Sequence, residues 1–188
     1  MKKTALIFAC LILSACFGGY SESSKFYNLQ PITDVSPLSS QKTIIGIEAV
    51  ELPEYIDRPQ IVSTEKGSSQ VQISETNRWS ESLDTLIQRT LTSDISAYLP
   101  QAVVKDKTIN DRFNITVDVQ ITRLDMIVND KAVLEAWWYI LDRAGNTLYR
   151  EKFSESLPID ASYNSFVSAT EKLLSTLSRE IAEKALKY

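Results

Sequence analysis

The chain has 188 residues, of which 44% are hydrophobic, 23% charged and 9% aromatic, and its formal net charge is −4. With five glycines and six prolines, this composition excludes a fibrous or low-complexity protein and predicts one folded domain. The sequence has no histidine, which excludes a Ser-His-Asp triad and zinc sites with histidine ligands. Both cysteines lie within the first sixteen residues, which excludes a disulfide framework, an iron–sulfur cluster and a thiolate enzyme in the folded body.

The first sixteen residues have the pattern of an export signal. A basic start precedes an apolar run at 4–13, and the run ends in small residues up to Ala15. Because a bilayer-spanning helix needs about 20 apolar residues, this run is too short to span a membrane. Residues 1–15 are therefore predicted to be a signal peptide. An ordinary signal peptide cut near Ala15 would leave Cys16 without a role.

The alternative gives Cys16 a function. Leu13-Ser14-Ala15-Cys16 resembles the lipobox of bacterial lipoproteins, in which the bond before the cysteine is cut and the cysteine carries diacylglycerol and an N-acyl chain. We therefore predict cleavage between Ala15 and Cys16 and lipidation of Cys16. Two or more acyl chains make membrane attachment stable. Phe17, where an aspartate usually marks retention at the inner membrane, favours an outer-membrane lipoprotein that faces the periplasm.

The mature chain is acidic. Removal of residues 1–15 takes away two of the 20 basic residues and none of the 24 acidic ones, which leaves a net charge of −6. Such a body has no general attraction to phosphate backbones, so nucleic-acid binding is not expected. Residues 16–25 are rich in glycine and serine and are predicted to be a lipidated flexible tether. The folded domain is expected at 26–188.

Extended segments dominate the start of this domain. Strands are predicted at 25–29 and 43–52, the second with Ile45, Ile47 and Ala49 on one face. Beyond Tyr55 the expected elements are an extended piece up to Val62, a hairpin tip at 65–69 and a returning strand at 70–74.

The first helix is predicted at 79–98. Its apolar residues recur at spacings of three and four and share one face. They are Trp79, Leu83, Leu86, Ile87, Leu91, Ile95 and Tyr98. Ser80 or Asn77 is expected to cap its start, and Pro100 marks its end. Trp79 is interpreted as a core residue.

The clearest strand signal spans 112–128. Apolar residues alternate with polar ones up to Ile121, and the parity then flips at Leu124. This flip predicts a β-bulge near Thr122–Arg123.

Four further elements complete the chain. They are a turn at 129–130, a strand at 132–142 that is apolar on both faces, a strand at 147–156 and a helix at 162–186. Two amphipathic helices and several strands without βαβ alternation predict an α+β fold. We expect a single domain in which two long helices pack on one face of an antiparallel sheet.

The sequence contains no recognisable catalytic or cofactor motif. There is no nucleophile elbow, phosphate-binding glycine loop or calcium loop, and Asp106, Asp111, Asp125 and Asp130 fall on predicted turns or the solvated strand face. We therefore assign no catalytic residue, no metal site and no cofactor, and we expect a protein that is not an enzyme.

The candidates for contact with a partner are Tyr55, Arg58, Trp137 and Trp138. Arg58 follows a turn at Tyr55, and its guanidinium either anchors a loop through a salt bridge or contacts a ligand. Adjacent strand residues point to opposite faces, so Trp137 and Trp138 are both buried only if both faces of the sheet are covered. If the helices cover one face, the other tryptophan would meet a partner, another copy of the chain or an apolar ligand.

Short motifs in a fixed order carry a family resemblance. After the lipobox cysteine they are Phe26-Tyr27-x-Leu29, Ile45-x-Ile47 leading to Leu52-Pro53-x-Tyr55, Arg58-Pro59-Gln60-Ile61-Val62, and Arg78-Trp79-x-Glu81-x-Leu83. Together they resemble the PqiC-like ABC-type transport auxiliary lipoproteins, over essentially the whole mature chain.

The resemblance implies a non-catalytic subunit of an intermembrane phospholipid-transport system. Its implied partners are a periplasm-spanning MCE-domain protein, the outer membrane through the acyl chains on Cys16, and further copies of the chain in a homo-oligomeric ring. Two alternatives stay open: a periplasmic lipid-binding carrier or chaperone with a cavity between helices and sheet, and an outer-membrane assembly lipoprotein.

Overall fold

The computed structural model describes residues 23–38, 42–108 and 112–188. The predicted signal peptide at 1–15, the lipidation site Cys16 and all of the tether before residue 23 lie outside the described residues. The elements are β1 (Lys25–Tyr27), β2 (Ile44–Ile47), β3 (Gln60–Glu65), β4 (Val71–Trp79), α2 (Leu83–Tyr98), β5 (Val103–Asp106), β6 (Ile115–Val128), β7 (Lys131–Leu141), β8 (Thr147–Pro158) and α3 (Tyr163–Ala185).

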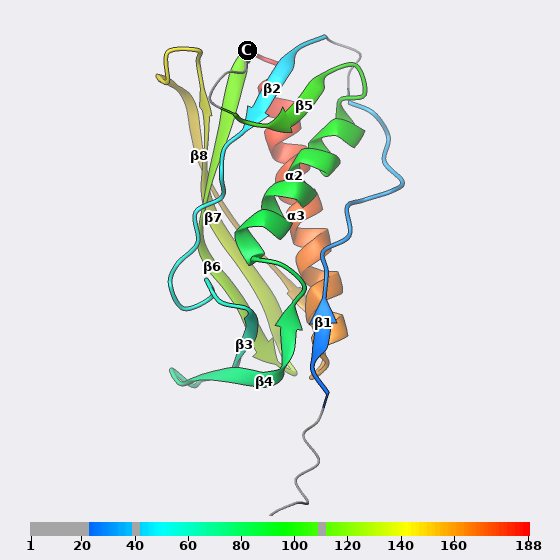
Figure 1. Ribbon diagram of the computed structural model, residues 1–188, viewed down its shortest axis with the longest axis vertical. Coiled ribbons are helices and arrows are strands. Elements are labelled where there is room, and N and C mark those ends of the chain that lie inside the picture. Colours follow the sequence, from blue (N-terminus) through cyan, green and yellow to red (C-terminus); the bar gives the residue numbers. More distant parts are fainter. Residues whose placement is uncertain (1–22, 39–41, 109–111) are drawn as a thin grey trace, which may run out of the picture.

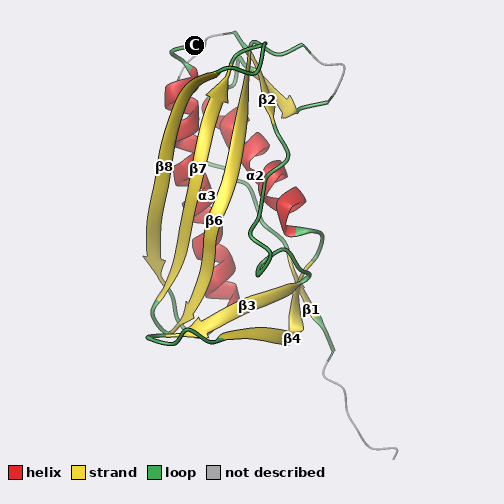
Figure 2. Cartoon of the chain, turned by 90° about the vertical axis from the view of Figure 1, so that its left-hand side faces the viewer, coloured by secondary structure: helices red, strands yellow, loops and turns green. Residues whose placement is uncertain are grey.

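Two layers form one α+β domain. Helices α2 and α3 pack against each other and cover one face of the sheet, while the long strands β6, β7 and β8 present the opposite face (Figures 1 and 2). The predicted class is confirmed, including the placement of both helices on one face. Ser162 caps α3 by accepting a hydrogen bond from the Ser165 backbone N–H at 3.1 Å.

The prediction of an antiparallel sheet is wrong in part, because the eight-stranded sheet is mixed. The β3–β4 hairpin and the β6–β7–β8 meander are antiparallel, as their short turns require. The pairs β1–β4, β2–β5, β2–β6 and β3–β6 are parallel. These strands meet through long connections, which leave strand direction free, so local patterning does not reveal it. Strand β5 was not predicted, since its four residues show no burial alternation.

The predicted start of the first helix is also wrong. Trp79 is the last residue of β4, and α2 begins at Leu83 with Ser82 at the N-cap position, so neither Ser80 nor Asn77 caps it. Trp79 is nevertheless a core residue, and its ring lies 6.3 Å from that of Phe166. Trp79 is four residues before Leu83 and is buried like the apolar residues of α2, so its position in the sequence fits the helical spacing although it lies in β4.

Side-chain parity changes twice along the strands. The β-bulge predicted near Thr122–Arg123 is confirmed by a register shift between Ile121 and Arg123. A second change was missed: β2 ends at Ile47, and beyond it Ala49 is exposed while Val50 is buried. The first change could be predicted because it interrupts a long alternation of apolar and polar residues. The second was missed because it lies in a short segment that has no such alternation.

The hydrophobic core of the described residues runs from Leu29 to Ala185. It joins the inward faces of β2, β6 and β7 to the facing sides of both helices. A chain that begins at residue 17 therefore retains this whole core, and we expect it to fold without the signal peptide and the lipid-bearing cysteine.

One carboxylate is buried between the helices and the segment that follows β1. Asp94 of α2 has no exposed surface and accepts a hydrogen bond from the Ile32 backbone N–H at 2.7 Å, while its second oxygen, Oδ2, has no partner. Burial raises the pKa of Asp94 to about 6, and the nearby Glu171 carboxylate adds to the shift. Glu171 in turn accepts from the Gln30 backbone N–H at 2.8 Å. Both helices thus hold residues 30–32.

The Asp94→Asn variant should be more stable than the parent at pH 8. Since the folded-state pKa lies above the ordinary value, the parent gains stability as the pH falls through about 6. The amide keeps the acceptor for Ile32 without the buried charge. We expect a gain of about 1–3 kcal/mol at pH 8 that shrinks as the pH falls from about 6 toward the ordinary carboxyl pKa of about 4, measured by urea unfolding. The exposed Asp34→Asn variant is the control, and a loss of stability at pH 8 would contradict this account.

Candidate partner-binding surface

The loop between β2 and β3 completes the free edge of β6. The Glu48 backbone N–H donates to the Val117 carbonyl at 2.9 Å, and the Ile121 N–H donates to the Glu51 carbonyl at 2.9 Å. Strand β3 then takes over the edge from Met126 onward. The β-bulge leaves a gap between these two stretches, and the candidate residue Tyr55 lies at that gap.

The Tyr55 side chain replaces the missing strand partner at the bulge. Its hydroxyl accepts from the Leu124 backbone N–H at 3.1 Å and donates to Asp125 Oδ1 at 2.8 Å. Arg123 Nε donates to the other oxygen of Asp125 at 2.5 Å. Burial, together with the Asp125 carboxylate, raises the pKa of Tyr55 well above its usual range. The phenol is therefore neutral and serves to hold the loop on β6.

Arg58, three residues further on, is far less constrained. Its Nη2 donates to the Glu54 carbonyl at 3.5 Å, and its Nε is buried without a hydrogen-bond partner. Within the described part of the chain the guanidinium forms no ion pair. The loop-anchoring salt bridge that was one interpretation of Arg58 is thus not formed among these residues.

The two adjacent tryptophans of β7 have different surroundings. Trp138 points toward the helices and has no exposed surface, so it offers nothing for a partner to contact. Trp137 points to the helix-free face, where it is half-buried between Gln120 of β6 and Lys152 of β8. The Arg150 guanidinium lies 4.0 Å from the centre of the Trp137 ring, a cation–π contact. Of the pair, only Trp137 remains a candidate.

A row of alternating charges crosses the helix-free face beside Trp137. Arg123 Nη1 lies 3.4 Å from Glu135 Oε1, and Lys152 Nζ lies 3.1 Å from Glu135 Oε2. Hydrogen bonds from Lys152 and then Arg123 lower the pKa of Glu135. These charges are already paired within the protein. Sequence reasoning missed Arg150 and this row, because opposite charges on neighbouring strands become partners only once the register is known.

Other kinds of site find no support in the described ranges. No group of three or more acidic residues there is arranged to hold a metal ion. None of the helices in those ranges is both long and apolar enough to cross a membrane.

Tyr55→Phe should destabilise the protein by about 1–3 kcal/mol, because it leaves the Leu124 N–H and the Asp125 carboxylate without their partner. Chemical denaturation measures the loss. Tyr139→Phe is the matched control, since the Tyr139 hydroxyl has no hydrogen bond within the described part of the chain, and it should change stability by less than about 0.5 kcal/mol. Equal effects of the two variants would remove the structural role given to Tyr55.

The structure defines a two-layer α+β domain in which helices close one face of the sheet and the other face is open, with Trp137 under the Arg150 guanidinium. The chain belongs to the family of ABC-type transport auxiliary lipoprotein components, whose model matches residues 27–182. The expected family resemblance is thereby confirmed. No curated protein matches the sequence.

Two solved structures share the fold. An uncharacterised protein is 21% identical, with a TM-score of 0.74 over 87% of this chain and 99% of its own. A protein of family DUF330 from Xanthomonas campestris is 12% identical, with a TM-score of 0.70 over 85% of this chain and 93% of its own. At these identities the likeness establishes the arrangement of helices and strands, and the function rests on the family.

Proposed function

We propose that the protein is the non-catalytic outer-membrane lipoprotein subunit of an MCE-type intermembrane phospholipid-transport complex, where it docks the periplasm-spanning MCE-domain protein. The observation that carries this proposal is the family match over residues 27–182, which covers nearly the whole folded domain. The lipobox-like sequence that ends at Cys16 supports attachment to a membrane.

The proposed mechanism is spatial. Acyl chains on Cys16 hold the domain at the inner leaflet of the outer membrane, and the nine residues up to Lys25 reach at most about 30 Å. The domain then receives the end of the transporter, so that phospholipid passes between membranes without exposing its tails to water. Each exposed methylene would cost about 0.8 kcal/mol, which favours a continuous conduit.

The helix-free sheet face is the proposed docking surface. It holds Trp137 under the Arg150 guanidinium, and tryptophan and arginine are enriched at the energetic centres of interfaces. Arg58, in the loop before β3 and outside this face, is a separate candidate contact, with a guanidinium that has no ion pair among the described residues. The proposal also includes contacts between copies of the chain, which would form a homo-oligomeric ring.

A lipid carrier is the weaker candidate. A carrier would need room for an acyl chain between helices and sheet. The pocket lined there by Ile56, Trp79, Leu124 and Phe166 has a volume of about 10 Å³, which is room for about one water molecule. The packing of this region therefore favours docking.

Cys16→Ala should abolish acylation. The parent should incorporate labelled palmitate and sediment with the outer membrane, whereas the variant should lose the label and leave that fraction. Cys10→Ala is the matched control, because Cys10 lies in the segment predicted to be removed, and it should behave as the parent. An unlabelled parent, or a parent found in the inner membrane, would overturn the proposed anchoring.

A photo-crosslinking amino acid placed at Trp137 should capture the MCE-domain protein in intact cells. The same amino acid at Lys172, which is exposed on the outer side of α3, should not capture it. Mass spectrometry identifies the product. Capture from Lys172 alone would place the interface on the helices, and capture of an outer-membrane assembly machine from Trp137 would favour the assembly-factor alternative.

A further inference from the structure

A pocket of about 400 Å³ opens beside β1, and Trp137 is not among the residues that line it. It lies between β1, the turn at 57–59 and the residues that precede α2. Its volume falls in the range of about 300–1,000 Å³ that small-molecule sites occupy. We call it the β1 pocket.

The β1 pocket has an apolar wall. Phe26 of β1 lines it and is 66% exposed, the largest exposed fraction among the large hydrophobic side chains of the described chain. Pro59 and the core residues Trp79 and Leu83 form the rest of this wall. An exposed phenyl ring beside apolar side chains offers hydrocarbon contact to a ligand.

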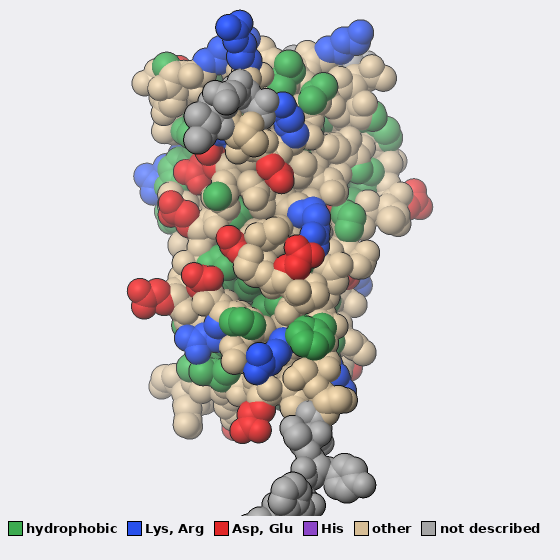
Figure 3. All heavy atoms as spheres, viewed as in Figure 1, with side chains coloured by type: hydrophobic (Ala, Val, Ile, Leu, Met, Phe, Trp, Pro, Cys, Tyr) green, Lys and Arg blue, Asp and Glu red, His purple; other side chains and the backbone are tan. Residues whose placement is uncertain are grey.

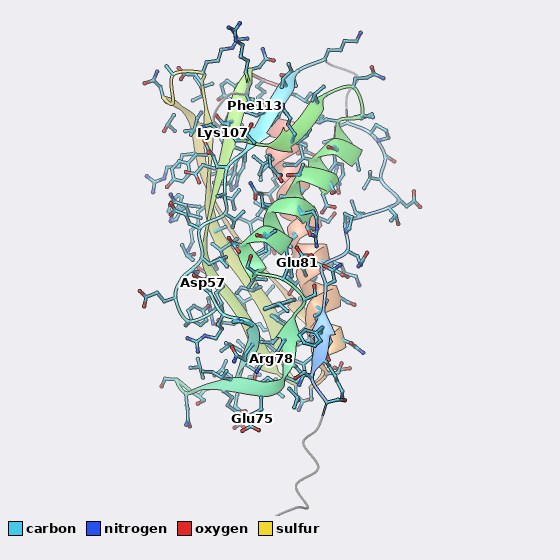
Figure 4. All side chains as sticks on the ribbon, in the orientation of Figure 1. Asp57, Glu75, Arg78, Glu81, Lys107 and Phe113 are labelled. Carbon is cyan, nitrogen blue, oxygen red and sulfur yellow. The ribbon has the colours of Figure 1, made fainter. Side chains whose placement is uncertain are left out.

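Two opposite charges without an ion pair among the described residues also line the pocket. Arg58 Nε is buried and donates to no acceptor, and the adjacent Asp57 carboxylate is exposed and has no ion pair within the described residues. The third charge, Glu81, is held by Arg89 at 2.9 and 3.0 Å. Figure 4 shows that Asp57 and Glu81 come from different segments, the loop before β3 and the connection before α2. The pocket thus offers one free cation and one free anion.

The position of the pocket selects a ligand from the membrane. Strand β1 lies toward the lower end of the molecule in Figure 1 and begins at Lys25, nine residues after Cys16. A tether of that length keeps Phe26 within about 30 Å of the bilayer. Figure 3 shows basic and hydrophobic side chains side by side near this end. This step rests on the anchoring described under the proposed function.

We propose that the β1 pocket binds the zwitterionic headgroup of a phospholipid of the phosphoethanolamine type. The Arg58 guanidinium donates to the phosphate through its terminal nitrogens, since its Nε is buried. The Asp57 carboxylate takes the ammonium group. The glycerol and first methylenes lie against Phe26 and Leu83. A purely anionic headgroup would leave Asp57 unpaired and be repelled by it, so the two free charges together favour the zwitterion.

The test uses the chain from residue 17 onward, which keeps the described core and carries no acyl chain. Its outcome therefore does not depend on lipidation of Cys16. The probes are dihexanoyl phosphatidylethanolamine and dihexanoyl phosphatidylglycerol, both kept monomeric, and inorganic phosphate. Nuclear magnetic resonance follows the Arg58 Nε–H signal during each titration. We expect saturable binding of the ethanolamine lipid, with a shift of this signal, and weaker binding of the other two probes.

Two variants separate the charge contacts. Arg58→Gln should lower the affinity for the ethanolamine lipid roughly tenfold or more, as loss of a charge-assisted hydrogen bond does. Asp57→Asn should weaken the ethanolamine lipid and strengthen the glycerol lipid, which reverses the preference. Arg150→Gln, on the helix-free sheet face, is the matched control and should leave both affinities unchanged. Thermal unfolding verifies that each variant is folded.

A third variant covers the case in which Arg58→Gln fails to fold. Phe26→Ser should weaken both lipids and leave inorganic phosphate unaffected, because it removes only the apolar contact. The proposal is overturned if inorganic phosphate binds as tightly as the lipid, if Asp57→Asn leaves the preference unchanged, or if neither lipid binds. Loss of palmitate labelling in cells with intact headgroup binding would instead refute only the anchoring.

Discussion

Everything in this domain depends on how the long strand β6 is held along its two edges. On one edge it pairs with β7 from Thr116 to Ile127, with the β-bulge between Ile121 and Arg123. The other edge is shared by β2, the loop at 48–51 and β3, and the β-bulge separates the last two. The Tyr55 hydroxyl satisfies the backbone at that break, so the sheet bends without leaving a buried N–H unpaired.

The two faces of the sheet differ in burial and in charge. The face under α2 and α3 is closed by a continuous apolar core, and within it even the alternate residues of β7, including Trp138, have no exposed surface. The opposite face holds paired charges and the Trp137–Arg150 contact. The apolar core thus lies on one side of the sheet, and the other side carries the proposed docking surface.

The surroundings of each candidate residue in the tertiary structure decide whether it is a structural residue or a surface residue. Tyr55 is a structural hydrogen-bond donor and acceptor, Trp138 is core, and Trp137 and Arg58 remain at the surface. Sequence alone paired the two tryptophans correctly on opposite faces, because strand geometry has a strict period of two. It did not reveal which of them the helices would cover, since that depends on the direction in which α3 packs.

Local periodicity was sufficient to predict the β6–β7–β8 meander and helix α3, because these elements are long and repeat their own pattern. The bulge near Thr122–Arg123 could be predicted because it interrupts such a pattern. The same sequence determined the signal pattern before Cys16 and the family to which the chain belongs. Only the tertiary structure decided that the sheet is mixed, that Trp79 ends a strand, and that Arg58 and Asp57 line one pocket with Phe26. The physical reason is that these outcomes depend on segments that meet across long connections, whose direction and register no local pattern encodes.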